Sequence, residues 1–141
     1  MPRAGTSPSA AAILIAVLFA AHASDGRPQT SAAQSQITGT WRGDSECVQQ
    51  NSACHAESNV YRFTELTSRP GWFSGTGSKV LNGKEISMGT LEWQYDPKSH
   101  TLESRTPNGV FRFLISADKM EGTLFLPDSI PYRRIHLTKT Q

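Results

Sequence analysis

The 141-residue sequence lacks several features that mark common protein classes. Two cysteines are too few for a disulfide-dense miniprotein or a four-cysteine zinc site. The 14 Lys and Arg barely exceed the 12 Asp and Glu, which argues against a dedicated nucleic-acid-binding protein. Only one long apolar run occurs, near the start, so the remainder holds no candidate membrane span. No window shows the 3.6-residue periodicity of an amphipathic helix.

Local catalytic and metal-binding motifs are also missing. The sequence has no Gly-x-Ser-x-Gly elbow, no P-loop, and no His-x-His or His-x-x-x-His pair. His55, His100 and His136 are far apart in the chain. These absences favour a protein that is not an enzyme and that uses no cofactor and no metal. A catalytic site assembled from distant strands remains the open alternative.

The single apolar run spans residues 10–21, between Arg3 and the small-residue site Ala21-His22-Ala23. This order is typical of a secretory signal peptide. A run of about a dozen residues is shorter than the roughly 20 that a membrane-spanning helix needs. We predict a signal peptide over residues 1–23, export to the periplasm or the extracellular space, and no stable membrane span after cleavage. An N-terminal anchor or a buried helix is the alternative.

The segment at residues 24–36 has no aromatic side chain and no aliphatic one larger than alanine. Such a composition buries too little surface to offset the entropy of ordering, which predicts a flexible N-terminal segment. The folded domain then covers residues 37–141. About 100 residues suffice for one modest core.

Turn signals punctuate this domain at nearly even steps. They are centred at residues 70, 82, 97, 108, 118 and 128, so successive turns lie 10 to 15 residues apart. Even spacing of this size is typical of an all-β sandwich or barrel. Asn82-Gly83 supplies the positive φ values of a two-residue hairpin turn.

Apolar and polar residues alternate between the turns. Leu91, Trp93 and Tyr95, for example, are separated by polar residues. A period of two places one face of a strand inward and the other outward. We predict eight strands, over residues 38–46, 58–66, 72–81, 84–95, 100–106, 109–116, 119–126 and 131–139. Short links favour sequential antiparallel pairing, and eight such strands can close into an up-and-down barrel without exposed edges. A sandwich is the competing architecture.

The first predicted strand begins with Gly39-Thr40-Trp41. A Gly-x-Trp at this place resembles the lipocalin and avidin group of calycin-type barrels, and small lipocalin-like inhibitors of secreted bacterial metalloproteases. The resemblance implies a lipocalin-like barrel in which Trp41 plugs one end and a late arginine packs over its ring. Arg133 shares parity with Ile135 and should face inward, so we expect it to be that partner, through a cation–π contact of about 0.5–2 kcal/mol.

Cys47 and Cys54 lie in a polar loop after the first predicted strand. In an exported protein the default is a disulfide, which should stabilise the fold by about 2–3 kcal/mol. A redox dithiol, or a metal pair with His55, is the alternative. We expect this loop to lie at a barrel rim.

Several side chains are candidates for a ligand-binding rim. Trp72 and Phe73 follow a Pro-Gly turn, where one of them must face away from the core. His55 and Tyr95 complete the set. An eight-stranded barrel has an interior just wide enough to fill with side chains or to hold one small ligand.

The sequence therefore predicts an exported, non-catalytic barrel that binds a small, partly apolar ligand at one end. The alternative is a secreted inhibitor or protein-binding module that acts on a partner enzyme through its loops or through residues 24–36.

Overall fold

The computed structural model describes residues 1–2, 5, 32, 36–49 and 53–141. Most of the predicted signal peptide and most of the predicted flexible segment lie outside these described residues. Within them, no helix combines the length and the apolar character needed to cross a membrane.

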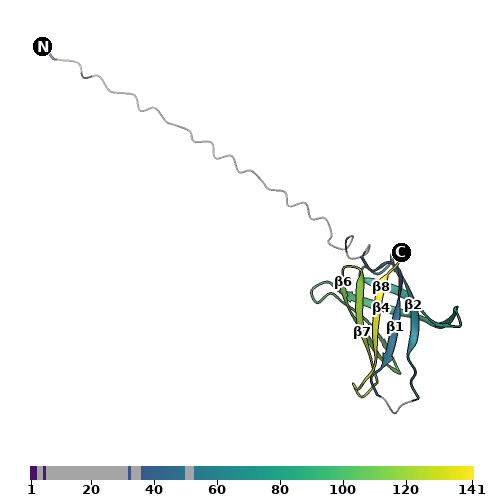
Figure 1. Ribbon diagram of the computed structural model, residues 1–141. Helices are drawn as coiled ribbons and strands as arrows, with labels where there is room; N and C mark the ends of the chain where they lie inside the picture. Colours follow the sequence, from purple (N-terminus) through teal and green to yellow (C-terminus); the bar gives the residue numbers. More distant parts are fainter. Residues whose placement is uncertain (3–4, 6–31, 33–35, 50–52) are drawn as a thin grey trace.

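Eight antiparallel strands form the domain, and each strand end falls within one residue of its predicted place. They are β1 (Gly39–Cys47), β2 (Glu57–Glu65), β3 (Trp72–Leu81), β4 (Lys84–Asp96), β5 (Thr101–Thr106), β6 (Gly109–Ser116), β7 (Lys119–Phe125) and β8 (Pro131–Lys139). Each strand pairs with the next, and β1 also pairs with β8, so the sheet closes into a barrel (Figure 1). The predicted up-and-down barrel is confirmed, and the sandwich alternative is wrong.

The weakest seam of the barrel lies between β4 and β5. These strands pair only where Gln94, Tyr95 and Asp96 meet Glu103, Leu102 and Thr101. The first part of β4 pairs with β3 alone, and this hairpin extends away from the rest of the barrel (Figure 1). Side chains lining the inside of β4 are consequently close to solvent near the hairpin turn.

Consecutive strands run in opposite directions, so the loops after β1, β3, β5 and β7 share one end of the barrel. We call this the open end, because the cavity described below opens there. The other end, where β1 begins, is the closed end. A Cys47–Cys54 disulfide bridges the β1–β2 loop at the open end, as the sequence predicts.

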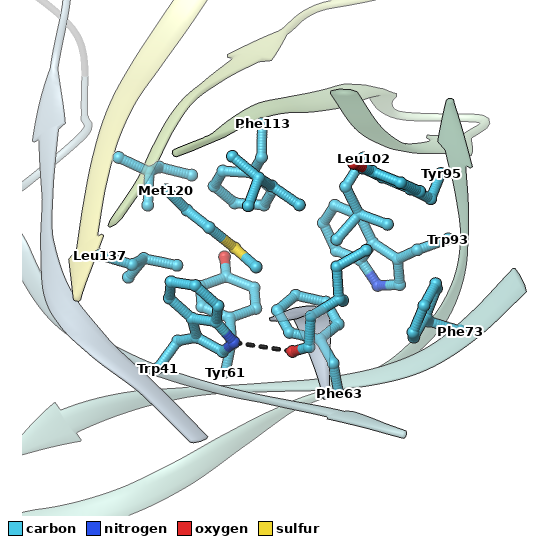
Figure 2. Close-up of a cluster of buried hydrophobic side chains, with 13 residues drawn as sticks. Trp41, Tyr61, Phe63, Phe73, Trp93, Tyr95, Leu102, Phe113, Met120 and Leu137 are labelled. Carbon is cyan, nitrogen blue, oxygen red and sulfur yellow. Dashed lines mark hydrogen bonds between the residues drawn. The ribbon is translucent and has the colours of Figure 1, made fainter. Parts of the chain in front are cut away.

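The closed end is filled by a continuous apolar core (Figure 2). Its central members are fully buried, and Trp93 stands perpendicular to Phe63 with ring centroids 5.4 Å apart. Trp41 is buried, and its indole nitrogen donates a hydrogen bond of 2.9 Å to the carbonyl oxygen of Ile37. Ile37 is itself fully buried, so this bond fixes the chain segment that covers the closed end.

The structure corrects one expected contact. Lys139, not Arg133, lies over Trp41, with its ammonium nitrogen 5.7 Å from the ring centroid. Antiparallel pairing places the start of β1 beside the end of β8, so Trp41 aligns with Lys139. Arg133 aligns with Cys47, six residues further along β1 and about 20 Å away at 3.3 Å per residue. The alternation gives the face of Arg133 but not its height along the barrel.

Two inward-facing glycines make room for aromatic rings. Gly122 aligns with Phe113 across β6 and β7, and a Cβ atom at Gly122 would lie 2.1 Å from Cδ1 of Phe113. A Cβ atom at Gly75 would lie 2.4 Å from the indole nitrogen of Trp93. Both rings therefore pack directly against strand backbone.

Candidate functional site

A cavity of about 330 Å³ occupies the open half of the barrel. Most of its walls are apolar, formed by Tyr61, Met88, Leu91, Trp93, Phe111, Leu124 and Ile135. Trp93 also belongs to the core, so the floor of the cavity is the top of the packed aromatic cluster. The barrel is thus divided into a filled closed half and a hollow open half.

Glycines on β3 help to keep the cavity open. Gly77 lines it, and a Cβ atom there would lie 3.3 Å from Tyr61 and 3.6 Å from Met88. A methyl group would fit with a small adjustment of these side chains, whereas a longer side chain would project into the cavity. The absence of a side chain at Gly77 therefore contributes directly to the volume.

One wall of the cavity is polar. Ser45, Glu57, Asn59 and Arg133 line it, and we call them the polar cluster. They lie on β1, β2 and β8, which are neighbours in the barrel. Leu91, Phe111 and other apolar side chains come from the facing strands. A ligand in the cavity would meet the polar cluster on one side and mostly apolar surface on the other, with Thr106 and Asn108 adding polar groups near the β5–β6 turn.

The polar cluster is held together by hydrogen bonds. Arg133 donates from Nη1 to Oγ of Ser45 at 3.1 Å and from Nη2 to Oε1 of Glu57 at 3.2 Å. Asn59 donates from Nδ2 to Oε2 of Glu57 at 3.5 Å. Ser45 and Asn59 are buried, and the side chains of Arg133 and Glu57 are 14% and 26% exposed. The ion pair is therefore sheltered but reachable from the cavity.

Arg133 faces into this wall because it keeps the inward parity of Ile135, and a strand irregularity follows directly beyond it. Leu124 aligns with Arg133 and Phe125 with Pro131, so one additional residue of β8 lies between the two pairs. Such a bulge re-aims side chains near a barrel rim. Arg133 faces inward, next to the cavity, while Arg134 is exposed on the outside.

The phenol of Tyr61 lines the cavity, and its pKa depends on burial and on the neighbouring charges. Burial, and then the negative charge of Glu57, raise the pKa of Tyr61 to about 12 against the opposing positive charge of Arg133. At the phenol, the influence of Glu57 exceeds that of Arg133. Burial is the largest cause, so the phenol stays uncharged beside the polar cluster until the pH approaches this pKa.

The four predicted rim residues do not gather in one place. Trp72, at the start of β3, is half-buried at the closed end beneath Arg69, whose guanidinium carbon is 3.8 Å from the ring centroid. Phe73 is 1% exposed and belongs to the core. Tyr95 is buried at the closed end, where its hydroxyl lies 3.1 Å from Nδ1 of His100.

His55 alone of the four lies at the open end, exposed beside the Cys47–Cys54 disulfide. Trp72, Phe73 and Tyr95 lie away from the cavity, because strand direction sends both sides of the β2–β3 turn and the end of β4 to the closed end.

Aliphatic side chains surround the open end instead. Six large apolar residues are well exposed in residues 36–49 and 53–141, and five of them lie in open-end loops or in the adjoining parts of β3 and β4. These five, the apolar rim, are Val48, Leu81, Ile86, Met88 and Ile130. Sequence reasoning missed them because isolated aliphatics beside turns give no periodic signal. Their placement at one end depends on three separate connections, β1–β2, β3–β4 and β7–β8, lying at the same end of the barrel.

Among the residues that the structure describes, no three His, Cys, Asp or Glu side chains come close enough together to hold a metal ion. His136 contacts Glu121 on the outer face of the barrel, away from the cavity.

Comparisons with known proteins support the fold. A redesigned β-barrel matches with 14% identity over 77% of this chain and 96% of its own, at a TM-score of 0.57. The Mycobacterium tuberculosis protein Rv2717c matches with 10% identity over 80% of this chain and 98% of its own, at a TM-score of 0.54. A Schistosoma mansoni fatty acid binding protein, solved with arachidonic acid, matches with 12% identity over 77% of this chain and 99% of its own, at a TM-score of 0.44.

The sequence itself matches no protein-family model and no curated protein. The two likenesses with TM-scores above 0.5 agree with the closed eight-stranded meander, and this barrel is consistent with the calycin-type resemblance carried by Gly39-Thr40-Trp41. At these identities the likenesses concern the fold alone.

Proposed function

We propose that this protein is an exported, non-catalytic barrel that binds one small, partly apolar molecule in the open-end cavity. The observation that carries the proposal is the cavity itself, about 330 Å³ with mostly apolar walls and a few convergent polar groups. Cavities of roughly 300–1,000 Å³ with this composition are the usual binding sites for small molecules.

The surroundings of the cavity fit this role. The apolar rim leaves Leu81, Met88 and neighbouring aliphatics exposed around the mouth. Met88 is the member of the apolar rim that also lines the cavity. An apolar molecule would bury rim and wall surface together, which favours entry from the open end.

Export is supported by the disulfide and by the predicted signal peptide. Disulfides such as Cys47–Cys54 persist in oxidising compartments and are rare in the cytosol. The signal peptide, over residues 1–23, stays a prediction.

The test is binding of Nile red, an uncharged apolar dye whose fluorescence rises in apolar surroundings. We expect the purified protein to bind the dye, and Gly77→Leu to weaken binding at least tenfold by filling the cavity. Thr76→Leu is the matched control, because the same side chain is added on the outer face of the same strand. Equal binding by a folded Gly77→Leu variant would contradict the cavity as the site.

The alternative role, inhibition of a partner enzyme, stays a prediction, because residues 24–36 lie mostly outside the described structure. Deleting residues 24–35 separates the two. A cavity binder keeps its affinity for Nile red, because Gln36 and Ile37, which close the other end, are retained. An inhibitor that acts through this segment loses its effect on the partner.

A further inference from the structure

The only inward-facing arginine at the cavity mouth among the described residues is already neutralised. Arg133 and Glu57 form an ion pair of 3.2 Å, and Ser45 and Asn59 complete the hydrogen bonding around it. The cluster as a whole has no net charge. It nevertheless presents both kinds of hydrogen-bonding group, since a guanidinium has five N–H donors and a carboxylate has several acceptor positions.

The electrostatics beside the cluster disfavour an anionic guest. At the Tyr61 phenol, whose pKa is raised chiefly by burial, the negative charge of Glu57 acts more strongly than the positive charge of Arg133. A ligand carboxylate at the polar wall would stand next to Glu57, and the low dielectric of the interior strengthens that repulsion. To free Arg133 for a new anion, Glu57 would have to lose its partner while still sheltered.

A cationic guest is disfavoured for a different reason. An ammonium group entering an apolar cavity loses its hydration, and Glu57 is already engaged by Arg133 and Asn59. An uncharged polar group loses much less hydration. It can accept a hydrogen bond from a remaining N–H of Arg133 and donate one to Glu57.

We propose, on the basis of the function proposed above, that the ligand is an uncharged amphipathic molecule whose polar end both donates and accepts hydrogen bonds, as a primary amide does. The polar end lies against Glu57 and Arg133, and the apolar body lies along Leu91, Trp93 and Phe111. The polar cluster is thus a specificity device that selects against fatty-acid-like carboxylates.

The experiment compares three molecules with the same apolar chain: decanamide, decanoate and decylammonium, at neutral pH. Each competes with Nile red for the purified protein. We expect decanamide to displace the dye at a concentration at least tenfold lower than decanoate or decylammonium. This comparison uses the unaltered protein and does not depend on any variant folding.

A variant then assigns the selectivity to the polar cluster. In Glu57→Gln the charge of Arg133 is unpaired, so we expect decanoate to gain at least tenfold in affinity and to overtake decanamide. Glu46→Gln is the matched control, because it removes the same charge from the exposed outer face of β1. It should leave the order of the three molecules unchanged.

The outcomes separate the two proposals. If Nile red does not bind, the proposed function and this inference both fail. If Nile red binds but decanoate or decylammonium displaces it as well as decanamide does, the inference is overturned while the binding function stands. The inference is also overturned if folded Glu57→Gln keeps the preference of the unaltered protein.

Discussion

Gly122 offers a sharp test of the packing in the closed half of the barrel. It lies on β7 directly across from Phe113, whose ring covers it. In Gly122→Ala the new methyl carbon would start 2.1 Å from Cδ1 and 2.3 Å from Cε1 of Phe113. Carbon atoms in contact normally lie about 3.5–4.0 Å apart, so the ring or the strand must move by more than 1 Å.

The size of the effect follows from two opposing contributions. Replacing glycine by alanine in a strand ordinarily stabilises by about 0.5–1 kcal/mol, because the unfolded chain loses conformational freedom. Overpacking a dense core destabilises by about 1–3 kcal/mol, and Phe113 is fully buried among other core rings. We expect Gly122→Ala to lower the free energy of unfolding by about 1–2 kcal/mol, and the melting temperature by about 5–15 °C.

Urea and thermal unfolding followed by tryptophan fluorescence measure this change. Gly77→Ala is the matched control: its methyl group would lie 3.3 Å from Tyr61, a ring that borders the cavity and can yield toward it. The free energy of unfolding of Gly77→Ala should be unchanged or slightly raised. In Gly122→Ala combined with Phe113→Leu, the penalty of the methyl group should shrink, because the obstructing ring is gone. A Gly122→Ala protein as stable as the control would refute the reasoning.

Three further predictions concern stability. Replacing both Cys47 and Cys54 by serine should lower the free energy of unfolding by about 2–3 kcal/mol, measured in urea; no loss would contradict the role given to the bridge. Trp41→Phe removes the hydrogen bond to Ile37 and should destabilise by about 1–3 kcal/mol in thermal unfolding, with an unchanged melting temperature as the contrary result. Because the pKa of Tyr61 is about 12 when folded and about 10 when unfolded, roughly 2–3 kcal/mol of stability should be lost as the pH rises from about 10 to 12. Tyr61→Phe should not lose this stability between pH 10 and 12. If its stability falls with pH as that of the unaltered protein does, the role given to Tyr61 is contradicted.

The strands and turns could be predicted from the sequence because their signals are local. Alternation fixed which residues in the second half of β4 face inward, and Asn82-Gly83 marked a hairpin whose two residues both have positive φ. The Cys47–Cys54 bridge was equally accessible, since the two residues lie seven positions apart and share one loop. Such features depend on backbone sterics and on short chain segments, which a single sequence displays directly.

The residues of the candidate site could not be predicted in the same way. Alternation gave Arg133 its inward face, but only the pairing of β1 with β8 gave its height, beside Cys47 and far from Trp41. The pairing of Arg133 with Glu57 joins residues 76 positions apart, and no local pattern connects them.

The sequence by itself determined the eight strands, their turns and the inward faces, because these depend on neighbouring residues. Only the tertiary structure decided which end is filled and which is hollow. Closure of the barrel brings Trp41 and Lys139 together at one end, and Glu57 and Arg133 together at the other. The cavity between them is the space left once all the side chains have packed, a property of the whole barrel that no single segment contains.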